Sequence, residues 1–303
     1  MAERELSGPP CAPALAARAA AALIPGAARI PFVAGGGGEV PDIVLTRAGV
    51  GIDRDHLAAY SRVCGFDLSD ALPPTYPSVL AFGLQLALLT DGRFPVPAVG
   101  LVHIANRITA HRALSAREQL DLRVWATALT PHRHGRAFDV RAEARCDGEL
   151  VWEQAATNLA PGQGIQDAPA RERPPSSEEL PVTAVWRLPG DLGRRYAAVA
   201  GDWNPIHLHP LTARPFGFPA PIAHGMWTKA RCLAALGPRL PGAMTVAVAF
   251  RKPIRLPATV GFAQGRGSSD GGLAFGVHRA GREPGDPPTR HLDGLISPPA
   301  RPA

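Results

Sequence analysis

The most informative stretch of this chain reads Gly201-Asp202-Trp203-Asn204-Pro205-Ile206-His207, and it is followed by Pro221-Ile222-Ala223-His224-Gly225-Met226. These two segments hold a carboxylate at Asp202, an imidazole at His207 and a glycine at Gly225. An Asp and a His can activate water and move a proton, which are the tasks of general acid–base catalysis. The pair therefore predicts a site that adds water to, or removes it from, an activated double bond.

Gly225 is the candidate donor for stabilising negative charge. The segment 222–236 is predicted to be a helix, because Met226, Ala230, Leu233 and Ala234 recur at helical spacing and Gly237-Pro238 ends the pattern. The first N–H groups of a helix have no acceptor within it, and a substrate carbonyl can approach a glycine closely. Such an N–H group can bind a developing oxyanion.

Together with Phe216-Gly217-Phe218, these segments resemble the signature of the MaoC-like, or hydratase 2, family of (R)-specific enoyl-thioester hydratases and 3-hydroxyacyl-thioester dehydratases. The resemblance implies reversible hydration of trans-2-enoyl thioesters to (3R)-hydroxyacyl thioesters of coenzyme A or acyl carrier protein, in fatty-acid metabolism. It implies that Asp202 and His207 hold one catalytic water, that the Gly225 amide binds the thioester oxygen, and that Asn204 orients the site. His209 stands where many members have Asp, at a position that is usually structural.

Other interpretations of the same residues stay open. Asp-x-Asn-Pro can be only a turn and helix start, because Asn and Asp cap helices and proline suits the first helical position. His207 and His209 can form part of a metal site, but no third ligand is evident nearby, so we expect no metal and no cofactor. We expect His224 to pack or hydrogen-bond at the helix start rather than perform chemistry. The alternative functions are a non-catalytic acyl-thioester binding protein and a hot-dog thioesterase.

Hydropathy indicates where in the cell the protein is located, and charge indicates which partners it binds. No apolar run reaches the roughly 18 residues of a membrane span, and the start lacks a signal-peptide pattern, so we expect a cytoplasmic protein. The net charge of +6 is either a solubility bias or an attraction to an anionic partner such as coenzyme A or acyl carrier protein. We find no nucleic-acid motif. Arg251 and Lys252 are the candidate contacts for coenzyme A or phosphopantetheine phosphates.

The sequence also contains an internal repeat. Residues 60–66 match residues 196–202 at an offset of 136, and residues 102–108 align with residues 248–254 at an offset of 146. The first copy thus lacks about ten residues, which correspond to Asn-Pro-x-His, and Phe66 stands in place of Asp202. We therefore predict that the first copy is catalytically inactive and that its helix shapes the acyl pocket.

Each copy shows one apolar helix followed by alternating apolar strands, which predicts an α+β fold with antiparallel sheets. The family resemblance implies the hot-dog fold, and two copies imply a double hot dog, a pseudo-dimer within one chain; a homodimer of such chains stays open. The predicted domains are an N-terminal, degenerate hot dog at 29–160, an exposed linker rich in Pro and Ser at 161–180, and the catalytic hot dog at 181–297. An alanine-rich helix is predicted at 14–23. Strands are expected at 42–51, 99–108, 119–129, 136–146, 149–159, 183–188, 245–253, 258–267, 272–279 and 291–296, and the first copy's helix at 77–90.

Overall fold

The computed structural model describes residues 2–8, 38–169, 177, 180–267, 272–279 and 288–299. The predicted helix at 14–23 lies outside these residues. The chain forms two compact units: the first comprises 1–52, 77–104 and 116–171, and the second comprises 53–76, 105–115 and 172–303. Each unit is thus assembled from segments distant in sequence, and the predicted boundaries at 160 and 181 stay a prediction. Among the described residues, no helix has the length and hydropathy needed to cross a membrane.

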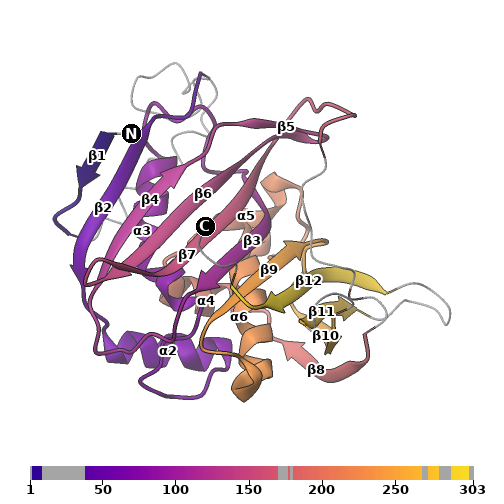
Figure 1. Cartoon of the computed structure of the whole chain (residues 1–303). Coiled ribbons are helices and arrows are strands. Elements are labelled where there is room, and N and C mark those ends of the chain that lie inside the picture. The colour runs from indigo at the N-terminus through magenta and orange to yellow at the C-terminus, as the bar shows by residue number, and fades with distance from the viewer. Residues whose placement is uncertain are drawn as a thin grey trace. The chain divides into compact units, whose positions relative to one another are not determined.

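The first unit is a sheet with a helix behind it (Figure 1). Its strands pair antiparallel, except that the strand Ala2–Glu5 runs parallel to the strand Ile43–Val50. Apolar side chains of the helix α3, among them Ala81, Leu84 and Leu88, are buried at helical spacing. The chain turns between two long strands at Asp147-Gly148, where both residues have positive φ, as a two-residue hairpin with a type I′ turn requires. The elements are β1 (Ala2–Glu5), β2 (Ile43–Val50), α3 (Tyr76–Leu89), β4 (Leu120–Ala126), β5 (Thr130–His132), β6 (Gly135–Cys146) and β7 (Glu149–Pro161), with the order β1-β2-β4-β6-β7 and β5 paired to β6.

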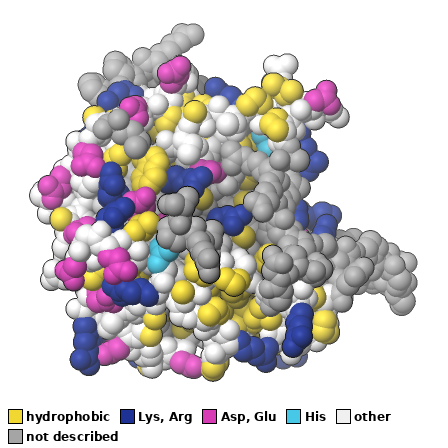
Figure 2. Space-filling model, viewed as in Figure 1, with side chains coloured by type: hydrophobic (Ala, Val, Ile, Leu, Met, Phe, Trp, Pro, Cys, Tyr) yellow, Lys and Arg dark blue, Asp and Glu magenta, His cyan; other side chains and the backbone are white. Residues whose placement is uncertain are grey.

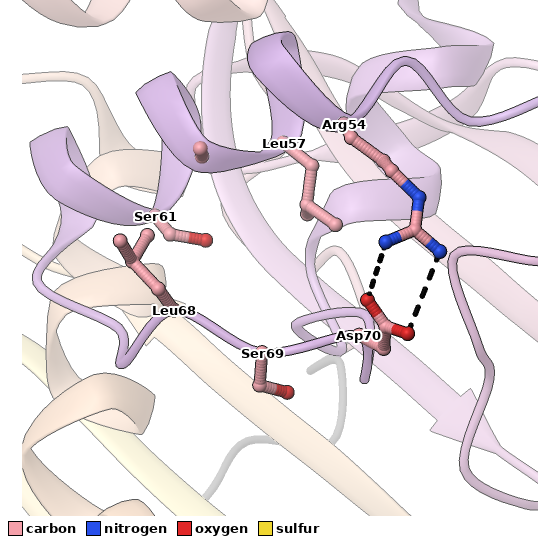
Figure 3. A pocket seen from close by; sticks show the side chains of 7 residues that line it. Arg54, Leu57, Ser61, Leu68, Ser69 and Asp70 are labelled. Carbon is pink, nitrogen blue, oxygen red and sulfur yellow. Dashed lines mark hydrogen bonds and ion pairs between the residues drawn. The ribbon is translucent and has the colours of Figure 1, made fainter.

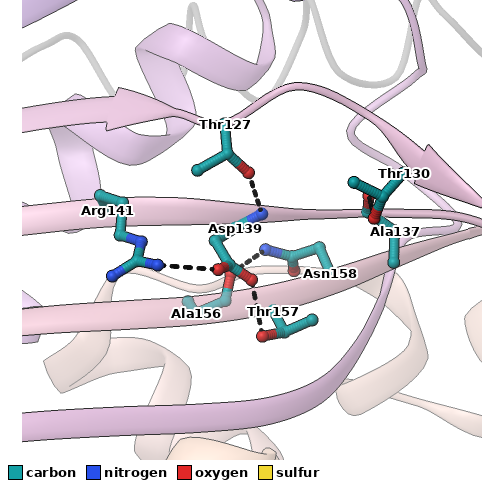
Figure 4. Close-up of polar contacts among 8 residues, drawn as sticks. All are labelled: Thr127, Thr130, Ala137, Asp139, Arg141, Ala156, Thr157 and Asn158. Atoms are coloured by element: carbon teal, nitrogen blue, oxygen red, sulfur yellow. Dashed lines mark hydrogen bonds and ion pairs between the residues drawn. The ribbon is translucent and has the colours of Figure 1, made fainter. Parts of the chain in front are cut away.

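Strand β6 alternates buried apolar residues with polar residues, so that one face of the sheet is polar. Figure 4 shows the contacts around Asp139 on that strand. Its carboxylate accepts hydrogen bonds from Thr157 Oγ1 at 2.7 Å and from Arg141 Nη2 at 3.2 Å, while its N–H donates to Thr127 Oγ1 at 2.9 Å. These contacts tie three neighbouring stretches of the unit together on its polar face.

The second unit places the helix α6 against another antiparallel sheet. The helix buries a large apolar set that includes Trp227, Leu233 and Leu236. A long helix packed on an antiparallel sheet is the hot-dog arrangement expected from the resemblance. The elements are β3 (Val102–Ala110), whose residues 105–110 belong to this unit, β8 (Val182–Leu188), α6 (Gly225–Leu236), β9 (Met244–Phe250), β10 (Ala258–Arg266), β11 (Leu273–Arg279) and β12 (Thr289–Ser297), in the order β3-β9-β12-β11-β10-β8.

Two further helices of this unit, α2 (Arg54–Cys64) and α4 (Leu192–Ala200), were not predicted as helices. They contact each other. Each ends at a glycine in the left-handed region, Gly65 with φ 82° and Gly201 with φ 76°. These glycines occupy equivalent positions of the repeat, which supports the alignment at an offset of 136 residues. Short helical turns follow α4 and α6: η2 (Pro205–His207), α5 (Pro210–Ala213), η3 (Arg214–Phe216) and η4 (Gly237–Arg239).

Two local expectations differ from the structure. Ser177 lies in the segment predicted to be an exposed linker, yet it is buried, because its N–H and its hydroxyl both donate to Asp293 Oδ1. Strand β9 ends at Phe250, so Arg251 and Lys252 lie just beyond the strand; their N–H groups still donate to the backbone of β12.

Candidate functional site

The loop after α4 is shaped by its own polar side chains. Asp202 Oδ1 accepts a hydrogen bond from the N–H of Asn204 at 3.2 Å. Asn204 Oδ1 in turn accepts from the N–H of Ile206 at 3.4 Å, which caps η2, and Pro205 occupies the first position of that turn. The capping interpretation and the orienting role predicted for Asn204 are therefore compatible, because the cap fixes the path from Asp202 to His207.

The ring of His207 has a defined tautomer. Its Nδ1 lies 2.7 Å from the carbonyl oxygen of Ile222, which can only accept, so Nδ1 carries the proton and Nε2 has a free lone pair. Burial lowers the pKa of His207, against the opposing effects of Asp202 and of the Ile222 hydrogen bond. The imidazole is therefore neutral near pH 7 and can act as a base through Nε2.

Asp202, His207 and His224 come together in space. One carboxylate oxygen of Asp202 and one ring nitrogen of each histidine lie within 4.8 Å of one another. A water molecule makes hydrogen bonds of about 2.8 Å, so a single water can bridge two atoms at such separations. The structure thus brings together the predicted pair Asp202 and His207 in a geometry that suits one shared water.

Two histidines and a carboxylate are also the residue types that bind zinc. The sequence-based metal hypothesis paired His207 with His209, and this pairing is wrong. His209 is exposed and caps α5, where its Nδ1 accepts from the N–H of Leu211. His224 is the third group instead, but its ring stacks on that of His207 with centroids 3.6 Å apart. Ligands to one metal normally radiate from it, so stacked rings fit a metal poorly.

Gly225 begins α6. The carbonyl of His224 accepts the first intrahelical hydrogen bond, from the N–H of Thr228, so the N–H of Gly225 has no acceptor within the helix. A Cβ at this position would lie 3.0–3.2 Å from ring atoms of Phe250. The glycine thus allows tight packing against Phe250 and suits a close approach by a carbonyl group.

A set of buried aromatic side chains lies behind the site. The Tyr196 ring is 4.9 Å from the His224 ring, and the Tyr60 ring is 6.3 Å from Tyr196. The Tyr60 hydroxyl lies 2.7 Å from Thr75 Oγ1. Burial raises the pKa of both tyrosines, so they stay neutral. Tyr60 and Tyr196 occupy matching positions of the repeat, and that match is the sequence signal by which their pairing could have been predicted.

Arg251 and Lys252, the predicted phosphate contacts, differ in their surroundings. Arg251 Nε donates to Asp293 Oδ2 at 2.6 Å, and Asp293 is fully buried, so this guanidinium serves an internal ion pair. Lys252 is exposed. On the face of the molecule in Figure 2, basic and acidic side chains are interspersed rather than gathered by sign.

Two surface pockets stand apart from these residues. One, of about 280 Å³, lies on α2 and includes the Arg54–Asp70 ion pair at 2.8 Å (Figure 3). The other, of about 550 Å³, belongs to the first unit and is lined by residues such as Val96, Leu101 and Pro161. Neither of these two pockets is lined by a residue of α3, so the role of that helix in shaping an acyl pocket stays a hypothesis.

Comparison with known proteins gives concordant results. Residues 167–268 match the family model of the MaoC like domain. The chain is 37% identical over 235 residues to 3-hydroxyacyl-thioester dehydratase X of Mycobacterium tuberculosis, covering 77% of this chain and 84% of that protein. The crystal structure of HtdX from the same organism aligns with a TM-score of 0.72 and 34% identity, over 84% of this chain and 98% of that one.

A more distant M. tuberculosis protein, described as having a double hotdog fold, aligns with a TM-score of 0.53 and 15% identity, over 86% of this chain and 94% of that one. At that identity the likeness concerns the fold alone. The expected α+β double hot-dog fold is confirmed by these alignments.

Proposed function

Because the chain belongs to the MaoC-like dehydratase family, we propose that it interconverts trans-2-enoyl thioesters and (3R)-hydroxyacyl thioesters. The observation that carries this proposal is the meeting of Asp202 and His207 directly beside the N-terminus of α6. The similarity to 3-hydroxyacyl-thioester dehydratase X supports the same activity.

In the hydration direction, one water donates a hydrogen bond to Asp202 and its other proton to Nε2 of neutral His207. The oxygen of the water attacks the β-carbon, and the π electrons move through the α-carbon to the thioester oxygen. His207, now protonated, returns its proton to the α-carbon on the same face, so addition is syn and His207 is neutral again. Dehydration is the reverse sequence.

The thioester oxygen gains negative charge during this reaction. The N–H of Gly225 and the positive end of the α6 dipole would stabilise that charge, and one such donor is worth roughly 3 kcal/mol in comparable sites. His224, adjacent to Gly225, touches both Asp202 and His207, which keeps the oxyanion donor next to the water-binding pair.

The first test follows enoyl-thioester absorbance with crotonyl- and dodecenoyl-coenzyme A and with a crotonyl-loaded acyl carrier protein. We expect the wild-type protein to remove the absorbance and form a (3R)-hydroxyacyl product. Asp202→Asn should retain the fold and lose at least about a hundredfold in turnover. Release of free thiol would support a thioesterase instead. Tight binding without turnover would support a binding protein.

We further propose that the substrate carries a phosphopantetheine group, as part of coenzyme A or of acyl carrier protein, and that Lys252 contacts a phosphate of this carrier. Because Lys252 is exposed, Lys252→Ala should raise KM for the coenzyme A substrate, more strongly at low salt, and leave kcat unchanged. Arg255→Ala, at another exposed cation three residues along the chain, is the matched control. An equal rise in KM for both variants would indicate general charge attraction rather than a specific contact.

A further inference from the structure

The side chain of His224, immediately before α6, makes a hydrogen bond outside that helix. It is the N-cap residue of that helix, yet its side chain makes no capping hydrogen bond. Instead Nε2 lies 3.0 Å from the backbone carbonyl oxygen of Asp202. Since a carbonyl oxygen only accepts, Nε2 carries the proton and donates it.

The same ring makes two more contacts with the proposed catalytic pair. It stacks on the ring of His207 with an interplanar angle of 25°. Its Nε2 also lies 3.8 Å from Asp202 Oδ2. The ring also packs against Tyr196, which is itself buried. His224 is 2% exposed, so these contacts leave it little freedom to move.

The three groups of the proposed reaction lie on separate pieces of chain. Asp202 follows α4, His207 ends η2, and Gly225 begins α6. His224 bonds to the first, stacks on the second and is covalently joined to the third. We propose that His224 is a positioning residue that holds the carboxylate of Asp202, the base His207 and the N–H of Gly225 in fixed positions relative to one another. This inference rests on the proposed function.

The charge state of His224 suits this task. The groups that face it are His207, Asp202 and Tyr196. Burial lowers the pKa of His224 well below its usual value, and the neighbouring His207 lowers it further. A neutral His224 leaves His207 as the group that takes up the proton of the water during turnover, because two stacked imidazolium ions would repel each other.

The test uses two substitutions that separate the contacts of the ring. His224→Gln places an amide N–H near the position of Nε2 and can still donate to the Asp202 carbonyl, whereas His224→Phe keeps the stacked ring and removes the donor. His209→Phe is the matched control, since His209 is an exposed histidine nearby that touches none of the three groups. For each variant, kcat, KM, the pH profile of kcat/KM and the midpoint of thermal unfolding are measured on a substrate that the wild-type protein converts.

We expect His224→Phe to lose tenfold to about a hundredfold in kcat with KM within about twofold, because misplacing reacting groups by an ångström has effects of this size. In the pH profile of kcat/KM for this variant, the decline on the acidic side should move to lower pH. The reason is that a displaced Asp202 no longer raises the pKa of His207. His224→Gln should retain most of the wild-type kcat, and its kcat/KM should decline at the same acidic pH as in the wild type. His209→Phe should match the wild type in both properties.

Wild-type kcat in His224→Phe would overturn the inference. So would an equal loss in both His224 variants with no shift in the acidic decline of kcat/KM, which would indicate packing alone. An inactive wild-type protein with every enoyl thioester would instead overturn the proposed function, so the two failures are distinguishable.

Discussion

Gly193, on the first turn of α4, lies directly against the backbone of His207. A Cβ on Gly193 would collide with the carbonyl oxygen of His207 and come within 2.9 Å of its carbonyl carbon. Because Gly193 has no Cβ, the loop that holds the proposed base His207 can pack directly against α4. Leu57 occupies the equivalent position in the first copy of the repeat, where the Asn-Pro-x-His residues are missing and a surface pocket is found instead.

Gly193→Ala should therefore displace the His207 loop and lower kcat at least tenfold. Alanine favours helices over glycine by up to about 1 kcal/mol, so an effect on helix propensity alone would stabilise the protein. Gly190→Ala is the control, because a Cβ there meets only ordinary contacts. Steady-state kinetics of both variants check this, and equal activities would show that the loop does not depend on Gly193.

Gly225→Ala should lower kcat/KM about tenfold or more, because the new methyl group meets the Phe250 ring and moves the N–H away from the thioester oxygen. The double variant Gly225→Ala/Phe250→Leu removes part of that obstruction and should recover part of the activity. A double-mutant cycle on kcat/KM measures the coupling. Additive losses would show that Phe250 does not mediate the effect.

The pH profile should reflect the buried base. Since burial lowers the pKa of His207, the neutral imidazole persists below pH 6.5, the ordinary pKa of histidine. We expect kcat/KM to stay constant as the pH falls through 6.5 and to decline only in more acidic buffer. Initial rates from pH 4.5 to 9 test this. A decline of kcat/KM that begins above pH 6.5 as the pH falls would contradict the assignment of His207 as the base.

The buried carboxylate of Asp293 should make stability sensitive to acid. Burial alone would raise the pKa of Asp293, but hydrogen bonds from Ser177 and Arg251 outweigh it and lower the pKa. Its contribution is therefore present above the pKa of the unfolded state, near 4, and is lost as pH falls through the folded value. Asp293→Asn should lower the free energy of unfolding by on the order of 3 kcal/mol at pH 7, and by less at pH 3. Denaturant unfolding at both pH values measures the difference. An equal loss at the two pH values would show that the stability does not depend on the ionisation of Asp293.

Lys229, on α6, should also make stability increase with pH, but over a more alkaline range than Asp293. Its side chain is fully buried, and its Nζ donates to Asn106 Oδ1 at 2.6 Å and to the carbonyl of Val246 at 3.0 Å. Burial, with a smaller effect of Arg107, lowers the pKa of Lys229 well below its usual value. The unfolded chain then binds more protons between the two pKa values, so this residue's contribution to stability increases as pH rises toward about 10. Lys229→Met should remove that increase, which unfolding experiments from pH 6 to 10 can detect.

Much of the secondary structure is predictable from local patterns. The alternating strands at 136–146 and 149–159 and the helix at 77–90 lie within two residues of β6, β7 and α3. Leu57, Tyr60 and Cys64 recur at helical spacing, so α2 is also predictable from the sequence, and the repeat extends the same prediction to α4. The boundaries of the loop that holds the proposed catalytic pair follow from short-range capping by Asp202 and Asn204, which a sequence can reveal.

Three features can be read from the residue order alone: the family resemblance, the repeat, and an Asp, a His and a helix-starting glycine at characteristic spacing. These are properties of neighbouring residues, where propensity and capping act. Three other features depend on the folded chain: Ile222 fixes the tautomer of His207, His224 stacks on that ring, and Arg251 is bound to Asp293. Those contacts join residues that are distant in sequence or separated by a turn, and they depend on burial and close packing, which no local pattern encodes.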